Sequence, residues 1–295
     1  EQGALEALMA SDDAQWAKID GEIRDIRSRF GKDTALGKRR TDFAEPPDVV
    51  GLDLDQAMIE KEPVTVVCSE MGWIRSVKGH LADGSGLTYK QGDRGRFVVH
   101  ATTTDKVLLF ASSGKAFTLD VARLPGGRGA GEPVRLMADM EASDAIVALM
   151  VNVPRRRLIV ASSDGYGFIV GEDDCLATTR KGKQVMNVKV PAEVQACAAV
   201  PEGADHVAVV GENRKLLVFA LSDLPQMSRG RGVRLQKYRD GGLSDVKAFR
   251  LAEGLAWRDT SGRTWTASDI EEWVGSRAQA GRLPPKGFPR SNRFA

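Results

Sequence analysis

The apolar and polar positions of the chain repeat in five similar units between residues 64 and 288. Each unit opens with a β-prone apolar run, makes a tight turn and then places an aromatic or large apolar residue. The copies read VTVVCSEMGW (64–73), KVLLFASSGKAF (106–117), RLIVASSDGYGF (157–168), HVAVVGENRKLL (206–217) and GLAWRDTSGRTW (254–265), with Gly72, Gly114, Gly165, Arg214 and Gly262 at the turns. Strand repeats of about 40 to 50 residues are typical of the blades of a propeller-like ring. The aromatic residues Trp73, Phe117, Phe168 and Trp265 recur at this period and are predicted to pack in the core.

A helical pattern precedes the strands. Residues 1–10 are typical of the end of one helix, and Ser11 is a suitable N-cap for the next. One face of that helix carries Trp16, Ile19, Ile23, Ile26 and Phe30, at spacings of three and four. We therefore predict a helical segment over 1–36, a linker over 37–48 and an all-β domain over 49–295. The helical face has no partner within this segment, so we expect it to pack on upstream residues of a longer protein.

A basic, glycine-containing segment follows each predicted turn. These segments read RSVKGH (75–80), GGRGAGE (126–132), RKGKQ (180–184), SRGRG (228–232) and RAQAGR (277–282). Glycine allows close backbone approach to a ligand, and Arg or Lys supplies charge and hydrogen-bond donors. Repeated at the edge of a ring, such segments form a curved basic track, for which double-stranded DNA is the natural partner. The alternative is that they are ordinary solvated connections; five copies at the blade period favour the track.

Ten side chains of these segments are the candidate DNA contacts. They are Arg75, Lys78, Arg128, Arg180, Lys181, Lys183, Arg229, Arg231, Arg277 and Arg282. We predict that they lie together on the outer rim of the ring.

The charge of the chain is segregated rather than high overall. The 42 Lys and Arg residues against 40 Asp and Glu residues leave a net charge of +2. A nucleic-acid site must therefore come from local clusters. Residues 225–239 and 277–295 each carry basic residues and no acidic one, whereas 41–62 is strongly acidic.

No motif of a known active site is present. The sequence lacks a nucleophile elbow, a P-loop, zinc-ligand spacing and a dinucleotide fingerprint. The acids Asp173 and Asp174 fit a solvated turn better than a metal site. The cysteines Cys68, Cys175 and Cys197 form no CxxC, which indicates buried thiols in a reducing cytosol. We predict no catalytic residue, metal, cofactor or small-molecule substrate in this chain, and no transmembrane segment or signal peptide.

The chain resembles the C-terminal DNA-binding region of the A subunits of bacterial topoisomerase IV, relatives of the gyrase A subunit. The resemblance covers essentially the whole chain. It is carried by EIRDIRSRFGKDTALGKRRT (22–41), MGWIRSVKGH (71–80), YKQGD (89–93), TTDKVLLFASSGKAFTL (103–119), LPGGRGAGEPV (124–134), RKGKQVMNV (180–188), LSDLPQMSRGRGVRLQKY (221–238) and GRLPPKGFPRSNRF (281–294). It implies a β-pinwheel, a ring whose neighbouring blades exchange strands, here with five blades and a DNA-bending rim.

For the full-length protein, the resemblance implies a type IIA topoisomerase that uses ATP and Mg to decatenate and relax DNA during chromosome segregation. Its partners would be a second A subunit together with the B subunit, both bound through the upstream part. The cleavage tyrosine of the family lies upstream, so Tyr89, Tyr166 and Tyr238 are not assigned that role. The implied location is cytoplasmic and nucleoid-associated, and the family also allows peripheral membrane association.

Two alternative hypotheses for the function remain open at this point. The gyrase branch carries a QRRGGKG box, which this chain lacks; the nearest strings are GGRGAG (126–131) and SRGRG (228–232). Their difference from the box favours bending by a topoisomerase IV-type domain over gyrase-type wrapping. A protein-interaction propeller that docks a chromosome-associated partner is the second alternative. For an enzyme with a site in the central channel, the sequence offers no set of catalytic residues.

Overall fold

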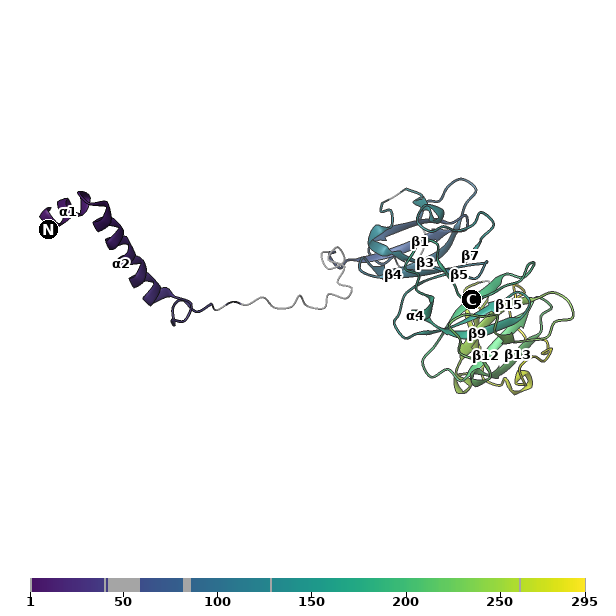
Figure 1. Ribbon diagram of the computed structural model, residues 1–295. Helices are drawn as coiled ribbons and strands as arrows, with labels where there is room; N and C mark the ends of the chain where they lie inside the picture. Colours follow the sequence, from purple (N-terminus) through teal and green to yellow (C-terminus); the bar gives the residue numbers. More distant parts are fainter. Residues whose placement is uncertain are drawn as a thin grey trace. The chain divides into compact units, whose positions relative to one another are not determined.

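The computed structural model describes residues 2–39, 41, 59–81, 86–127, 129–259 and 261–294. The chain divides into two units, Glu1–Leu54 and Asp55–Ala295 (Figure 1). The predicted linker over 37–48 lies mostly outside the described residues.

Two helices, α1 (Gln2–Met9) and α2 (Asp12–Phe30), form the described part of the first unit. The hydroxyl of Ser11 accepts a hydrogen bond from the backbone N–H of Ala14 at 3.3 Å, so Ser11 caps α2 as predicted. Gly31 ends the helix, and its N–H donates to the carbonyl of Arg27. No residue of either helix is buried, and Trp16 is 69% exposed. That upstream residues cover the apolar face remains a prediction.

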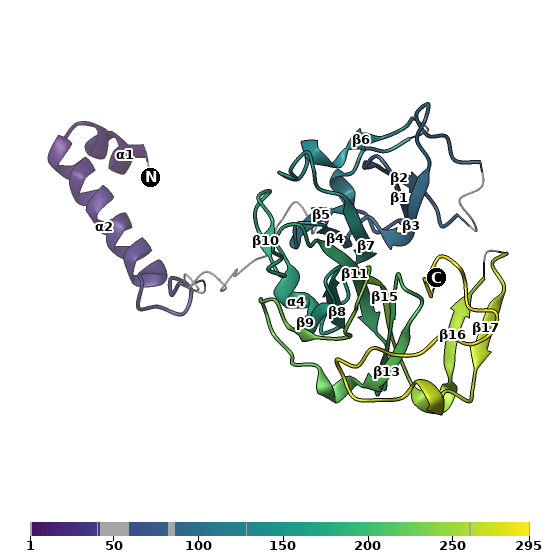
Figure 2. The ribbon, with the colours of Figure 1, turned by 90° about the vertical axis from the view of Figure 1, so that its right-hand side faces the viewer.

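Five antiparallel sheets form the second unit. Each contains a hairpin, and in four of them a further strand pairs with the first strand of the hairpin. The hairpins are β1 (Pro63–Ser69) with β2 (Trp73–Lys78), β4 (Lys106–Ala111) with β5 (Lys115–Asp120), β8 (Arg157–Ser162) with β9 (Tyr166–Gly171), β12 (His206–Gly211) with β13 (Leu216–Ala220), and β16 (Leu255–Arg258) with β17 (Thr264–Ala267). The strands β3 (Gly95–Thr102), β7 (Ile146–Val151), β11 (Val194–Val200) and β15 (Leu243–Phe249) pair with the first strands of the first four hairpins. Figure 2 shows the sheets arranged around a common centre, which confirms the predicted five-bladed all-β fold.

Short helical turns lie in the connections between strands. They are η1 (Val121–Arg123), η2 (Val134–Leu136), α4 (Glu172–Cys175), η3 (Leu221–Asp223), η4 (Leu251–Glu253) and η5 (Glu271–Trp273).

The five hairpin turns each need a left-handed backbone conformation. The glycines at four of them, Gly72, Gly114, Gly165 and Gly262, have φ between +80° and +85°. Glycine adopts this conformation without the steric cost that a Cβ brings. The fourth turn has Arg214 instead, at φ +58°. Its guanidinium donates to the carbonyl of Pro289 at 3.1 Å and to Oδ1 of Asn292 at 3.3 Å, so this turn also holds the C-terminal tail.

Neighbouring blades exchange strands, as the resemblance implied. The second hairpin strands β2, β5 and β9 pair with the short strands β6 (Glu132–Pro133), β10 (Lys183–Gln184) and β14 (Val233–Arg234), which come from the following blade. In the fourth sheet, Arg282 pairs with Leu216 of β13. A glycine with φ between +72° and +86° precedes each donated residue: Gly131, Gly182, Gly232 and Gly281. A Cβ on any of them would lie within 3.0 Å of a carbonyl oxygen of the receiving strand.

The hydrophobic core lies between successive blades rather than at one centre. In β4, Val107, Leu109 and Ala111 join the cluster shared with the first blade, whereas Leu108 and Phe110 join the cluster shared with the third. Successive side chains of a strand point to opposite faces. Both faces of these strands are therefore buried, which explains the unbroken apolar runs in the sequence.

The aromatic residues after the turns are only partly in this core. Phe117 and Phe168 are buried, as predicted, and Trp73 is half-buried. Trp265 of β17 is 39% exposed, and its Nε1 donates to Asp259 at 2.8 Å, so the prediction of core packing is wrong for this residue. Its exposure follows from the fifth sheet, where no described strand covers β17.

The C-terminal tail packs as a strap along the last two blades. Phe288 and Phe294 are buried with Trp257 in one cluster. The N–H of Phe294 donates to Oδ2 of Asp245 at 2.8 Å, and its carbonyl accepts from the N–H of Arg258 at 3.0 Å. The tail thereby takes the position beside β16 that β3, β7, β11 and β15 take in the other blades.

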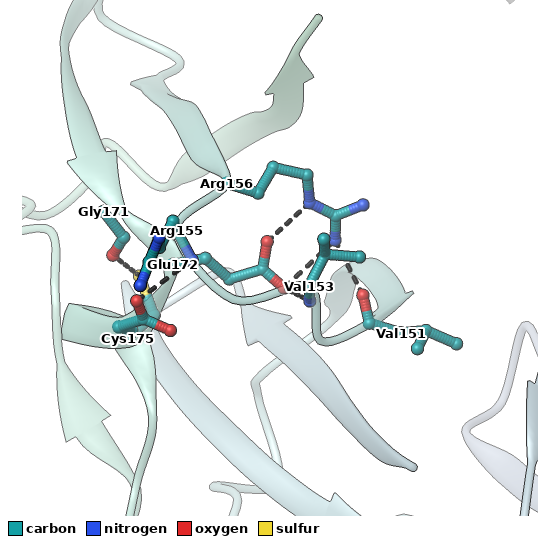
Figure 3. A network of polar contacts seen from close by, with 8 residues as sticks. Val151, Val153, Arg155, Arg156, Gly171, Glu172 and Cys175 are labelled. Carbon is teal, nitrogen blue, oxygen red and sulfur yellow. Dashed lines mark hydrogen bonds and ion pairs between the residues drawn. The ribbon is translucent and has the colours of Figure 1, made fainter. Parts of the chain in front are cut away.

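A buried ion pair fixes the connection between the second and third blades (Figure 3). The guanidinium of Arg156 donates to both carboxylate oxygens of Glu172, at 2.5 and 3.0 Å, and to the carbonyl of Val151 at 2.7 Å. Oε1 of Glu172 also accepts from the N–H of Val153 at 3.0 Å. Glu172 has no exposed surface, but its carboxylate is fully paired, which a buried charge requires.

The close approach at the exchange glycines can be tested through stability. Gly232→Ala should lower the free energy of unfolding by about 2 kcal/mol or more, because a left-handed φ costs a non-glycine residue about 1–2 kcal/mol and the receiving strand must also shift. The added Cβ would lie 2.2 Å from the carbonyl oxygen of Gly167. Urea denaturation gives the value. Gly79→Ala is the control, since Gly79 has φ +82° with no atom within 4 Å of a Cβ. Equal losses in the two variants would contradict the close-approach role.

Candidate nucleic-acid interface

Four of the basic segments predicted from the sequence are the connections that exchange strands between blades. We define the exchange segments as residues 125–139, 176–187, 225–237 and 274–282, without Arg128, which lies outside the described residues. Each crosses from its own blade to the second hairpin strand of the preceding one. Their basic residues are therefore held in place by strand pairing.

Successive exchange segments are hydrogen-bonded to one another. The N–H of Asp139 donates to the carbonyl of Arg180 at 2.7 Å, which joins the first segment to the second. The N–H of Asn187 donates to Gly230 at 2.7 Å, and that of Lys237 to Gln279 at 3.0 Å. These bonds make the four segments a continuous belt along the blades.

Four of the ten candidate residues are exposed on this belt and lie outside its described ion pairs. They are Lys181, Lys183, Arg229 and Arg282. Within the described exchange segments, the ion pairs involve Arg180 and Arg231, and not these four. Their charges are therefore available to an external anion.

Two further candidates hold the belt together. Arg180 is exposed, but its guanidinium donates to the carbonyls of Leu136 and Met137 in the preceding segment. Arg277 similarly donates to the carbonyl of Arg234 at 2.7 Å. These contacts show that part of the basic character of the segments serves the fold.

Arg231 contacts both an acidic side chain and an aromatic ring of the third blade. Its Nη2 lies 2.7 Å from Oδ2 of Asp164, and its guanidinium carbon lies 3.9 Å from the ring centre of Tyr166. Burial alone would raise the pKa of the Asp164 carboxyl, but donation from the Ser162 hydroxyl and the Arg231 guanidinium holds that pKa below its usual value. Asp164 is therefore charged at neutral pH and neutralises Arg231 locally.

The first blade departs from the prediction. RSVKGH is not a loop, because Arg75 and Lys78 belong to β2. Arg75 is 3% exposed and donates from Nη2 to the carbonyl of Thr88 at 3.0 Å, so the expectation that it lies on the exposed rim is wrong. Lys78 is exposed but forms an ion pair with Glu62 at 2.8 Å. The charge of these residues favours the rim, but charge alone does not identify the strand that contains them.

Two belt residues were absent from the candidates. Arg234 and Lys237 are both exposed, and Nη2 of Arg234 donates to the hydroxyl of Tyr166 at 2.9 Å. The acid-free stretch 225–239 contained them, so segregated charge was the signal that could have found them.

The described residues offer no arrangement typical of an active site. Among them, no three His, Cys, Asp or Glu side chains gather as a metal site would require. Burial raises the pKa of the Cys68 and Cys175 thiols to about 12, which keeps both protonated. No described helix is long and apolar enough to cross a membrane.

Comparison with known proteins finds similar sequences and a similar solved structure. Residues 156–201 and 205–243, which hold most of the third and fourth blades, match the family model of the DNA gyrase C-terminal domain, beta-propeller. The chain is 40% identical to the A subunit of DNA topoisomerase 4 from Rickettsia bellii and 41% identical to that from Caulobacter vibrioides, over 100% of this chain and 40% and 39% of those proteins. The solved structure of the E. coli ParC C-terminal domain superposes with a TM-score of 0.66 at 28% identity, covering 78% of this chain and 96% of that one.

The fold and the exchange segments thus define a propeller-like domain that is similar to the DNA gyrase C-terminal domain. More particularly, the chain is similar over its whole length to part of the A subunit of DNA topoisomerase 4, which confirms the resemblance found in the sequence. The chain spans 40% of the length of the Rickettsia bellii relative.

The pairing of Arg231 predicts a gain of binding when its partner is removed. Asp164→Asn should tighten binding of a short DNA duplex and steepen its salt dependence by up to about 0.9 in log–log slope, the value for one additional phosphate neutralised. Fluorescence anisotropy over a salt series measures both quantities. Glu202→Gln removes an equal charge from the turn between β11 and β12 and should leave the slope unchanged. An unaltered slope for Asp164→Asn would show that Arg231 does not reach DNA.

Proposed function

We propose that this chain binds double-stranded DNA along the exchange segments and bends it. The observation that carries the proposal is the continuous belt of hydrogen-bonded segments with exposed, acid-free cations at Lys181, Lys183, Arg229 and Arg282. The hydrogen-bonded segments hold these cations along a curved edge, and such a row of positive charges can neutralise the phosphates of a duplex. The similarity to the A subunit of DNA topoisomerase 4 supports the same partner.

Binding by this surface is electrostatic and largely independent of base sequence. Phosphate contacts position a duplex but carry no sequence information directly. The belt consists of short strands and turns, with η2 (Val134–Leu136) as the only described helical turn in it. It therefore offers side-chain cations and backbone N–H groups rather than a helix for the major groove.

Within a full-length A subunit, this domain would present a duplex to the cleavage core for ATP-dependent decatenation and relaxation. The cleavage tyrosine, ATP and Mg would belong to other parts of the enzyme, where a second A subunit would assemble with the B subunit through the upstream region. The site of action would be the nucleoid in the cytoplasm. No step of strand cleavage is assigned to this chain.

The charge distribution supports a partial bend rather than a complete wrap. The exposed cations lie on the segments that pair with the second, third and fourth blades. In the first blade, Arg75 is buried and Lys78 is paired with Glu62. Bending a short site costs on the order of 1–6 kcal/mol, which several phosphate contacts can offset.

Removal of the exposed cations tests the DNA surface. The triple variant Lys181→Gln, Lys183→Gln, Arg229→Gln should weaken duplex binding and lower the salt slope by about 0.9 for each phosphate that is no longer neutralised. The control variant, Lys18→Gln, Arg24→Gln, Arg29→Gln, removes the same charge from α2. Anisotropy titrations compare the two. Equal weakening in both would mean that net charge alone, and not this belt, governs binding.

A topology assay separates bending from wrapping. The chain is bound to nicked circular DNA, the nick is ligated, and the linking number is measured. We expect a small shift per bound chain together with clear bending in an energy-transfer assay, because the cations cover only part of the ring. A large shift of one sign would indicate gyrase-type wrapping and contradict the partial bend.

A further inference from the structure

The outer edge of the fifth blade has the backbone that receives an exchange strand in the other four. The carbonyl of Arg263 accepts from the N–H of Asp259, so the N–H and C=O of the next residue, Thr264, point away from β16. The equivalent positions of the first four hairpins, Ile74, Ala116, Gly167 and Leu216, are all paired with a donated residue. Among the described residues, no strand pairs with this edge of β17.

The first blade has a donor segment without an acceptor. Gly86 has φ +84°, like the glycines that precede the donated residues, and Leu87 and Thr88 follow it. The segment lies between β2 and β3, the same place in its unit that the exchange segments take in theirs. In the described part of the domain, no strand pairs with residues 87 and 88.

The space around the glycines separates the paired segments from the unpaired one. A Cβ at Gly131, Gly182, Gly232 or Gly281 would meet a carbonyl oxygen of the receiving strand at 2.2 to 2.9 Å. A Cβ at Gly86 would meet nothing within 4 Å. Gly86 therefore has the conformation of an exchange glycine without the neighbour that makes glycine necessary.

Side-chain contacts attach the unpaired segment to the first blade. The buried Arg75 donates to the carbonyl of Thr88 at 3.0 Å, and Nζ of Lys90 lies 3.4 Å from the ring centre of Trp73. These contacts use side-chain donors and a ring face. Between described residues, no backbone hydrogen bond uses the N–H groups of Leu87 and Thr88, which can therefore pair with a strand.

Both unpaired elements border the same seam of the ring. Phe294 of the tail is hydrogen-bonded to Arg258 of β16, and Arg293 lines a pocket with Glu70, Arg94 and Arg96 of the first blade. Figure 2 shows the carboxyl terminus between the first and fifth sheets. The donor and the acceptor thus belong to the two blades that the tail connects.

We propose that the segment 86–88 is a fifth exchange strand, which pairs with β17 and closes the ring. By the register of the other four exchanges, Leu87 would lie opposite Thr264, and Thr88 opposite Arg263. The occupant is this chain's own segment rather than a second copy, because both elements already flank the tail. Pairing would cover the edge of β17 with which no described strand pairs, and open edges favour pairing with other chains. The two-residue contact is short, so the ring can open again.

A disulfide tests the pairing in the absence of DNA, so its outcome is independent of the proposed function. In the closed form, residues 88 and 263 form a non-hydrogen-bonded pair, with Cα atoms about 4.5 Å apart, within the range of a disulfide. Thr88→Cys with Arg263→Cys should give a monomeric cross-linked chain under mild oxidation, located by mass spectrometry. Leu87→Cys with Arg263→Cys places the thiols on opposite faces and should not cross-link.

A glycine substitution provides the second measurement. Asn tolerates a left-handed φ better than other residues with a Cβ. Added to the Thr88→Cys, Arg263→Cys pair, Gly86→Asn should therefore leave the fold intact yet abolish the cross-link, because its Cβ would meet the carbonyl of Thr264. Gly92→Asn is the control, since Gly92 also has φ +80° and open space, and it should leave the cross-link unchanged. No monomeric cross-link, equal cross-linking in the Leu87→Cys pair, or a disulfide-linked dimer only would each overturn the proposal.

Discussion

The close approach of a glycine in one blade to a backbone carbonyl of the preceding blade is the contact on which the rest of the ring depends. It occurs at Gly131, Gly182, Gly232 and Gly281, all with positive φ. No side chain fits between the two backbones, so the donated strand lies directly on its neighbour. The same contact determines where the flanking basic residues lie. Fold and candidate DNA surface therefore share a few segments, in which Arg180 and Arg277 donate to neighbouring backbone carbonyls.

Much of the architecture could be predicted from the sequence because its signals are local. The hairpin turns follow from single glycines, and the unbroken apolar runs follow from strands buried on both faces between two blades. The tertiary partners of charged side chains could not be predicted. Arg231 forms an ion pair with Asp164, which lies far away in the sequence. Arg75 is buried in a strand, although its sequence is typical of a basic loop. The exchange glycine, rather than the density of basic residues, is the reliable marker of an exchange segment. By that marker the corresponding segment of the first unit is 86–88, not 75–80.

The two kinds of arginine in the belt have different physical roles. Side chains bound to carbonyls keep neighbouring segments in register, and they do so whether or not an anion is present. Arg229 donates only to the side-chain oxygen of Asn187, at 3.5 Å, and the described part of the belt shows no hydrogen bond from the exposed lysines, so these cations respond mainly to what approaches from solvent. A belt that is held by its own arginines does not need DNA to order it, so little ordering entropy opposes binding.

The strand exchange also imposes an order on biosynthesis. The hairpin of β4 and β5 leaves the ribosome before Lys183 and Gln184, which complete its sheet, have been translated. Because translation proceeds at about 5–20 residues per second, the residues that complete a sheet are synthesised on the order of seconds after its hairpin. The nascent domain thus always ends in an incomplete sheet, and a chaperone would meet the same type of open hairpin edge at each stage. A premature stop before Arg282 would leave the fourth blade unfinished as well as the fifth.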